Sequence, residues 1–312
     1  VLSALRERFV FVQETEITVE CNPGTLSAGR LASYRRAGVN RLSIGLQSAD
    51  DRELKLLGRI HTRAQFEESF ALAREAGFRN INIDLMSALP GQTASSWEST
   101  LRYVLALRPE HISAYSLIIE EGTPFFERYG DGGRAELLPD EETERAMYAR
   151  TGELLAAAGY EHYEISNYAL PGFACRHNVG CWEREDYLGF GLGAASLWQG
   201  ERFSRPGSME AYLAAAEEGR STRTERRRLT RKDEMEEFMF LGLRLLRGVS
   251  DARFRSRFGC GMAEIYGGVI EKYEGLGLLA RDGDRIFLTE RGIDVSNVIF
   301  SDFLLDEEDE RT

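Results

Sequence analysis

Short apolar runs alternate with helical patterns over the first third of the chain. The apolar runs predict strands at residues 16–21, 40–47, 78–90 and 111–120. The segments between them predict helices at residues 25–38, 63–76 and 97–106. This alternation is typical of βα units that build a parallel sheet. Four such units in succession favour a partial βα barrel of TIM type, although a doubly wound sheet has the same local pattern.

The pattern becomes longer and less regular after residue 125. A glycine-rich break at 130–133 precedes a long predicted helix at 140–158, with Asp140 as its N-cap and Gly159 as its closing residue. Residues 160–205 are aromatic-rich and predict irregular structure. Residues 206–228 are polar and basic, and we expect a linker there.

The last part of the chain predicts a small α+β domain. A helix starting after Thr230 and ending at Gly248 is followed by helices at 251–258 and 262–274 and by a hairpin turn at Asp282-Gly283. Three helices and a hairpin indicate a winged-helix-like domain. We therefore expect three regions: the barrel at 1–125, an extension at 126–220 and the C-terminal domain at 221–312.

Charge and cysteine content narrow the class of protein. The formal net charge of −12 argues against nucleic acid as a partner. The candidate recognition helix at 262–274 carries Glu264, Glu271 and Glu274 against Lys272, which is the wrong charge for a phosphate backbone. Four scattered cysteines without a CxxC do not suggest a secreted disulfide scaffold, so a cytoplasmic location is expected.

Four polar residues lie at or near the ends of the predicted strands, where a βα barrel builds its site: Glu20, Gln47, Arg59 and Asp84. Each alone suits a capping or solvated position. Together they present two carboxylates, one amide and one guanidinium to one rim. Arginine binds carboxylates with paired hydrogen bonds, and carboxylate and amide groups bind hydroxyls. The set therefore indicates a zwitterionic ligand that carries a ribose.

A series of motifs gives this chain a family resemblance. They are ECNPGT (20–25), GVNRLSIGLQS (38–48), LGRIH (57–61), NIDLMSALPGQT (82–93), HISAYSL (111–117), YEISNYA (163–169) and CRHN (175–178). In their order and spacing the chain resembles the radical S-adenosylmethionine (SAM) proteins of the oxygen-independent coproporphyrinogen oxidase group, and most closely their haem-chaperone branch. The resemblance covers nearly the whole chain.

The resemblance implies a SAM site lined by the four rim residues. It implies that Arg59 binds the methionine carboxylate, that Gln47 and Asp84 bind the ribose, and that Glu20 faces the methionine end or a second SAM. Members of the group also carry a CxxxCxxC motif whose thiolates hold a 4Fe–4S cluster. That motif is absent from this chain, which begins at Val1, and we expect that its natural beginning is missing.

A second group of residues lies in the segment HNVGCW (177–182). A neutral imidazole is a good axial ligand for haem iron, and a tryptophan offers an aromatic wall. The chaperone branch carries HNxxYW here, so the resemblance implies haem binding by His177, Asn178 and Trp182. Cys181 replaces the tyrosine, and it could ligate iron or only pack. A structural role for His177, or a zinc site with Cys175 and Cys181, stays open.

The resemblance leaves two functions open. The first is a chaperone that binds haem and transfers it to acceptor proteins, with SAM and a 4Fe–4S cluster in the full-length form. A peripheral association with a membrane is kept open for this function. The second is oxidative decarboxylation of coproporphyrinogen III in porphyrin biosynthesis.

For His61 and His111, which flank the rim, we expect hydrogen-bonded structural roles.

Overall fold

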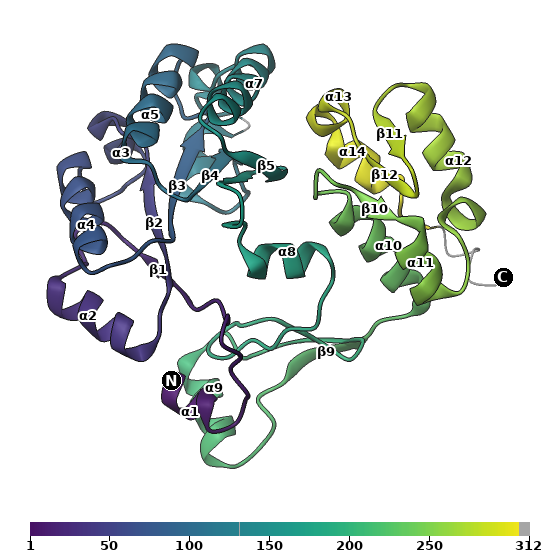
Figure 1. Ribbon diagram of the computed structural model, residues 1–312, viewed down its shortest axis with the longest axis horizontal. Coiled ribbons are helices and arrows are strands. Elements are labelled where there is room, and N and C mark those ends of the chain that lie inside the picture. The colour runs from purple at the N-terminus through teal and green to yellow at the C-terminus, as the bar shows by residue number, and fades with distance from the viewer. Residues whose placement is uncertain (131, 306–312) are drawn as a thin grey trace. The chain divides into compact units, whose positions relative to one another are not determined.

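A computed structural model describes residues 1–130 and 132–305 of the chain. The chain divides into two compact units, Val1–Ala174 and Cys175–Thr312 (Figure 1).

The first unit is built on a six-stranded sheet in the order β1-β2-β3-β4-β6-β5. Its parallel strands are β1 (Thr18–Cys21), β2 (Arg41–Gln47), β3 (Ile81–Ser87) and β4 (His111–Ser116). The antiparallel strands β6 (Asn167–Ala169) and β5 (Glu161–Glu164) extend it. The four predicted strands and the partial βα barrel are confirmed. The prediction of irregular structure from residue 160 is wrong for β5 and β6, which are too short to show a clear alternation.

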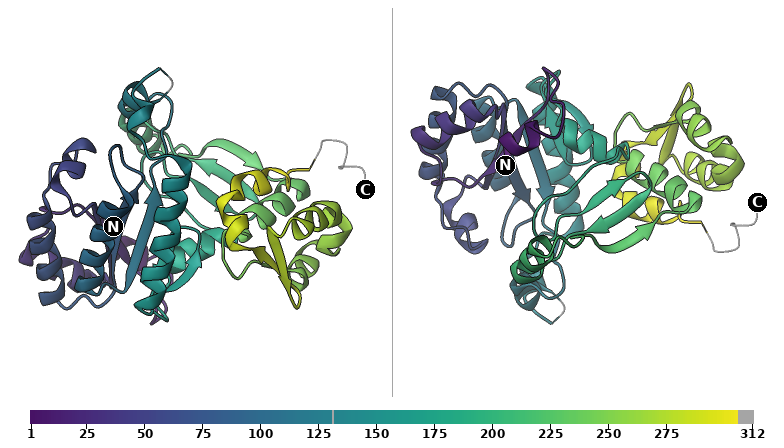
Figure 2. Two further views of the ribbon diagram at one scale, coloured as in Figure 1. Left: turned by 90° about the horizontal axis from the view of Figure 1, so that it is seen from above. Right: turned by 90° about the horizontal axis from the view of Figure 1, so that it is seen from below.

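Helices cover one face of this sheet (Figures 1 and 2). They are α2 (Ala28–Ala37), α4 (Arg63–Glu75), α5 (Ala94–Leu107) and α7 (Glu141–Ala157). Each begins at a residue whose side-chain oxygen accepts a backbone N–H, namely Ser27, Thr62, Thr93 and Asp140. The shorter helices of the unit are α1 (Leu2–Arg6), α3 (Asp51–Leu56), α6 (Pro124–Tyr129) and the 3₁₀ helix η1 (Ala135–Leu137).

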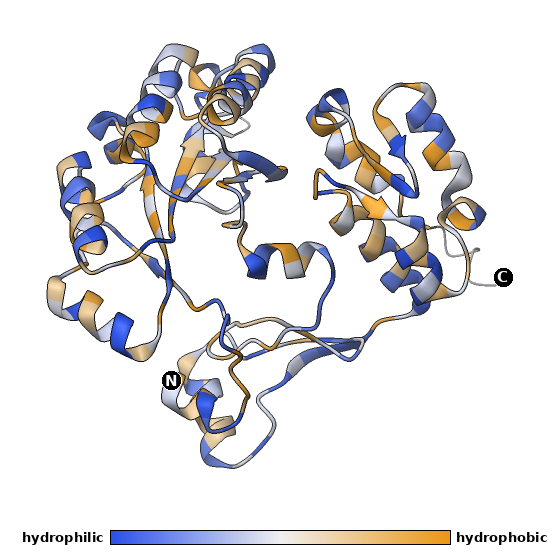
Figure 3. Cartoon of the chain, in the orientation of Figure 1, coloured by the Kyte–Doolittle hydropathy of each residue, from blue (hydrophilic) through white to orange (hydrophobic). Residues whose placement is uncertain are grey.

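The two faces of the sheet differ in chemistry. The aligned residues Cys21, Ile44, Ile83 and Ile112 belong to the hydrophobic core. The neighbouring row, Glu20, Ser43, Asn82 and His111, is polar throughout. Because successive side chains of a strand point to opposite faces, the polar row lies on the face that the helices do not cover. Figure 3 shows hydrophobic and hydrophilic residues following each other along these strands.

The second unit begins with α8 (Arg176–Trp182) and a three-stranded antiparallel sheet. The strands are β7 (Ser196–Trp198), β8 (Glu201–Ser204) and β9 (Thr224–Arg228). The predicted linker at 206–228 is wrong, because α9 (Met209–Glu217) and β9 form there. Ser208 caps α9, and β9 pairs with β8 although all its residues are exposed. Backbone pairing, rather than an apolar pattern, makes this segment a strand.

The end of the chain forms the predicted winged-helix-like arrangement. Helices α10 (Arg231–Gly242), α11 (Asp251–Phe258) and α12 (Met262–Gly275) accompany a sheet of β10 (Val249–Ser250), β12 (Arg285–Leu288) and β11 (Leu279–Asp282). Two short helices follow, α13 (Glu290–Asp294) and α14 (Ser296–Ser301). The first helix ends at Gly242 and not at Gly248, because the chain turns so that Val249 pairs with Ile286.

None of the helices within residues 1–130 and 132–305 combines the length and the apolar character needed to cross a membrane.

Candidate functional site

Three of the four predicted rim residues lie on the polar face of the large sheet. Glu20 is aligned with Ser43, and Gly45 is aligned with Asp84. Since Ser43 and Gly45 are two residues apart, the side chains of Glu20, Ser43 and Asp84 share one face. Glu20 is exposed and Asp84 is partly buried. The fold therefore brings together two carboxylates that are 64 positions apart in sequence, as their numbers show.

Asp84 is held by two neighbours. The hydroxyl of Ser43 donates to Oδ2 at 3.0 Å, and the amide nitrogen of Asn82 donates to Oδ1 at 2.7 Å. Each carboxylate oxygen can accept about two hydrogen bonds. One acceptor position on each oxygen therefore stays open, which suits a pair of neighbouring hydroxyls such as those of a ribose.

Gln47 reaches the same place through an unusual backbone conformation. Its φ of 70° lies in the left-handed region, and β2 is irregular between Gly45 and Gln47. The amide nitrogen of Gln47 lies 2.9 Å from the position that a Cβ on Gly45 would occupy. Gly45 thus leaves the room that the Gln47 side chain fills. The sheet aligns Gly45 with Asp84, so the amide and the carboxylate are neighbours.

Arg59 lies between α3 and α4 and is partly buried. Its backbone N–H donates to the carbonyl of Leu54 at 2.9 Å. Two residues further, the ring nitrogen Nε2 of His61 lies 3.3 Å from the carbonyl oxygen of Leu46, at the end of β2. Burial lowers the pKa of His61. The predicted structural role of His61 is confirmed: it ties the Arg59 loop to the strand that carries Gln47.

A buried network that sequence reasoning did not find continues from Asp84 along the polar face. The imidazole of His111 binds Asn82 through Nδ1 at 2.6 Å and Tyr163 through Nε2 at 2.8 Å. His111 is 0% exposed, and burial, helped by the Arg41 charge, keeps the pKa of His111 well below its usual range. The hydrogen-bonded role expected for His111 is confirmed. In the sequence, the only sign of the connection from His111 through Asn82 to Asp84 is that His111 flanks the predicted rim.

The second predicted group lies on helix α8 in the other unit. His177 is exposed, and its Nε2 lies 3.8 Å from Cys181 Sγ, one helical turn away. Burial, and secondarily the charge of Glu185, raise the pKa of the Cys181 thiol. Asn178 and Trp182 are partly buried on the same short helix. The helix thus presents one accessible imidazole beside a protonated thiol.

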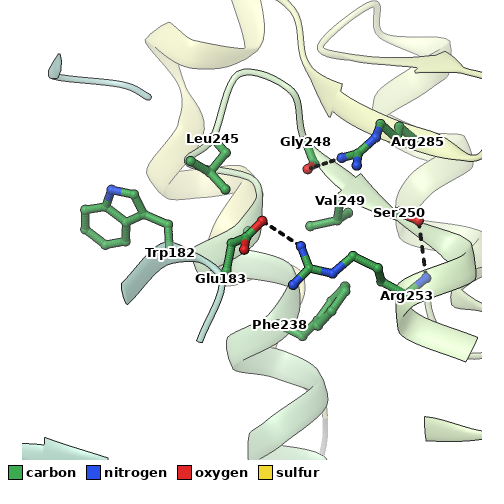
Figure 4. Close-up of a pocket in the computed structure, with 10 residues that line it drawn as sticks. Trp182, Glu183, Phe238, Leu245, Gly248, Val249, Ser250, Arg253 and Arg285 are labelled. Atoms are coloured by element: carbon green, nitrogen blue, oxygen red, sulfur yellow. Dashed lines mark hydrogen bonds and ion pairs between the residues drawn. The ribbon is translucent and has the colours of Figure 1, made fainter. Parts of the chain in front are cut away.

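Helix α8 is attached to the C-terminal domain at its end. The guanidinium of Arg244 lies 4.4 Å from the ring centroid of Trp182, within the range of a cation–π contact. Glu183, the next residue, accepts from Arg253 at 2.6 Å (Figure 4). Glu183 also pairs with Arg247. These contacts place the segment that carries His177 on the same body as α10 and α11.

The buried side chain of Arg184 also attaches the end of α8 to α10. Its side chain is 2% exposed and pairs with Glu237 at 2.6 Å and with Glu234 at 3.3 Å. Its φ of 58° is unusual for a residue other than glycine. The two carboxylates of α10 therefore hold the turn that ends α8.

A small cavity lies beside this attachment and is drawn in Figure 4. Its volume is about 20 Å³, and it is lined by Trp182, Glu183, Phe238, Leu245, Arg253 and other residues of the C-terminal domain. This volume suits one water molecule. It is too small for a haem.

The cysteines do not form a metal centre. Among residues 1–130 and 132–305 no three His, Cys, Asp or Glu side chains are arranged to hold a metal ion. The zinc site suggested for Cys175, His177 and Cys181 is therefore wrong. Cys175 is buried, whereas His177 is exposed. The described residues likewise do not bring together three cysteine thiolates that could hold a 4Fe–4S cluster.

The comparisons with known proteins agree with this architecture. Residues 2–104 match the Radical SAM superfamily, and residues 229–295 match the HemN C-terminal domain. The structure is similar to that in "Coproporphyrinogen III oxidase (HemN) from Escherichia coli is a Radical SAM enzyme", with a TM-score of 0.81 over 97% of this chain and 73% of that one. Sequence identity to it is 23%, so this likeness shows the fold. The chain is thus a protein of the radical SAM fold with a HemN-type C-terminal domain.

Similarity to sequences defines the family more narrowly. "Heme chaperone HemW" of Lactococcus lactis is 39% identical over 98% of this chain and 80% of its own length. "Heme chaperone HemW" of Bacillus subtilis is 38% identical over 93% of this chain and 76% of its own length. The chain belongs to the HemW family. Membership in the radical SAM superfamily implies SAM and a 4Fe–4S cluster as cofactors.

Proposed function

We propose that this protein binds haem through His177 and transfers it to haem-acceptor proteins, in the cytoplasm, with SAM bound on the polar face of its first unit. The observation that carries the haem assignment is the exposure of one imidazole. Of the four histidines in the sequence, His61, His111 and His162 are hydrogen-bonded within the first unit. His177 is exposed on α8. An accessible neutral imidazole is the side chain best suited to bind haem iron.

The attachment of α8 supports a ligand role for this helix. A helix of seven residues has little stability alone. The contacts of Trp182, Glu183 and Arg184 with the C-terminal domain supply the missing stability. Asn178 and the edge of Trp182 would then flank the porphyrin, and His177 would coordinate its iron from one side.

The SAM assignment depends on the polar face. Asp84 and Gln47 are neighbours with open acceptor and donor positions, which suits a ribose, and Glu20 lies one row away. Arg59 would bind the methionine carboxylate with paired hydrogen bonds. The reactive sulfonium group belongs to SAM itself. The residues of this chain bind and orient it.

A haem titration followed by Soret absorbance tests the haem assignment. The protein should bind haem saturably with one equivalent, and His177→Ala should weaken binding by about tenfold or more, the effect of losing about 1.4 kcal/mol. Arg220→Ala, on an exposed surface of the same unit, is the matched control and should bind as the unchanged protein does. Equal affinity of the His177→Ala variant would refute the assignment.

Calorimetric titration with SAM tests the second site separately. Asp84→Asn keeps the shape and removes the charge, and should weaken SAM binding by about tenfold. Glu75→Gln, an exposed residue at the end of α4, is the control. Turnover of coproporphyrinogen III by the protein would contradict the chaperone proposal and favour the enzyme alternative.

A further inference from the structure

A chain of hydrogen bonds runs beneath the proposed ribose site, and the carboxylate at its end determines which atom donates in each bond. The side chain of Asn82 is 2% exposed, and all its hydrogen-bonding positions are used. Its Nδ2 lies 2.7 Å from Asp84 Oδ1 and 2.8 Å from Ser43 Oγ. Its Oδ1 lies 2.6 Å from His111 Nδ1 and 3.2 Å from Ser113 Oγ. A carboxylate can only accept, so the nitrogen of the amide must face Asp84.

The orientation of the amide decides the tautomer of His111. Since Asn82 Oδ1 accepts, His111 Nδ1 must carry the hydrogen. A neutral imidazole has one donor and one acceptor, so Nε2 accepts from the hydroxyl of Tyr163. The bonds therefore all point one way, from Tyr163 through His111 and Asn82 to Asp84.

The chain of bonds determines how Asp84 presents its charge. A rotated Asn82 amide would place its oxygen against the Asp84 carboxylate, and two acceptors in contact repel each other. The donor on His111 Nδ1 strengthens this preference, because it needs an oxygen opposite it. Without His111, the amide keeps only the longer bond from Ser113 and the repulsion by Asp84 to oppose its rotation.

We propose that His111 is a positioning residue for ligand recognition: by fixing the Asn82 amide, it orients the Asp84 carboxylate toward the two hydroxyls of a ribose. This inference rests on the proposed assignment of Asp84 to the SAM ribose. His111 itself makes no contact with the ligand. Its effect on binding should therefore depend on whether the ligand carries ribose hydroxyls.

The sheet offers a matched control for a buried histidine. His162 in β5 stacks on Tyr168, with ring centroids 4.1 Å apart, and its Nε2 lies 3.2 Å from the carbonyl oxygen of Ile165. Because it is aligned with Tyr168 and, through it, with Ile112, it lies on the helix-covered face. Its removal should affect stability without changing Asp84.

Competition binding against labelled SAM tests the inference with two probes, adenosine and 2′,3′-dideoxyadenosine. The unchanged protein should prefer adenosine by about tenfold, the effect of hydrogen bonds to a charged group. His111→Phe should reduce this preference to about twofold or less. His111→Asn keeps a donor near the Nδ1 position and should retain the preference, as should His162→Phe.

The outcomes separate the inference from the proposed function. A His111→Phe variant that discriminates as well as the unchanged protein would overturn the inference and leave the ribose assignment standing. An unchanged protein that does not discriminate between the probes would overturn the ribose assignment of Asp84, and the inference with it. Circular dichroism checks folding. If His111→Phe does not fold, His111→Leu replaces it, because leucine also lacks the donor and is smaller than phenylalanine.

Discussion

The buried ion pair that holds the end of α8 permits a quantitative prediction. Arg184 has a side-chain exposure of 2% and is paired with Glu237 at 2.6 Å. Glu237 also accepts from Arg202 at 2.8 Å. The change Glu237→Gln keeps the shape of the side chain and removes the negative charge between these two arginines.

The size of the effect follows from burial. Removing one partner of a buried pair costs about 3–5 kcal/mol, because the other charge stays buried and uncompensated. Glu234 remains 3.3 Å from Arg184, so the lower end applies. We expect the free energy of unfolding to fall by about 3 kcal/mol. The change Glu218→Gln, in the exposed pair with Arg220, should cost about 0–1 kcal/mol and is the control.

Urea unfolding followed by tryptophan fluorescence measures both changes, and Trp182 lies two residues before Arg184 in the sequence. The double change Arg184→Met with Glu237→Leu removes both charges together. It should cost clearly less than Glu237→Gln alone, since the fully buried guanidinium of Arg184 is removed together with its main partner. A cost below about 1 kcal/mol for Glu237→Gln, or a larger cost for the double change, would refute the reasoning. On the proposed function, Glu237→Gln should also weaken haem binding.

Three further predictions concern the strands and the buried histidines. In Gly45→Ala, the new Cβ would lie 2.9 Å from the amide nitrogen of Gln47 and would displace that side chain. The SAM affinity measured by calorimetry should therefore fall, while the urea midpoint of unfolding barely changes. Unaltered SAM affinity would argue against Gln47 as a ligand. In Gly248→Ala, a φ of 64° and a clash with the Ile286 carbonyl should lower the unfolding free energy by about 2 kcal/mol or more, and an unchanged urea midpoint would contradict this. Burial lowers the pKa of His61, His111 and His162, so the unfolded chain binds more protons near pH 6. Stability should therefore be full above about pH 6.5 and fall as the pH drops below it, and a urea midpoint that stays constant from pH 7.5 to 5.5 would show that these histidines do not contribute.

The sequence by itself determined the repeating part of the fold. The apolar positions at 40–47 and 111–120 predicted β2 and β4, since successive side chains of a strand point alternately to the core face and to the polar face. Asp140 and Gly159 marked the ends of α7, because capping is a local interaction. The motifs around Asp84 and His177 likewise indicated the family that the comparisons show. Local chemistry was enough for all of these features.

Only the tertiary structure decided which polar residues work together. His111 is 29 positions from Asn82 and 52 from Tyr163, and no local pattern joins them. Strand β9 is exposed along its whole length, so the sequence shows no apolar pattern there. It forms because its backbone groups pair with those of β8. Arg184 and Glu237 are 53 positions apart, and each reads as an ordinary surface charge in the sequence. Hydrogen bonds and ion pairs between distant segments depend on strand register and helix packing, and these are set by the whole chain.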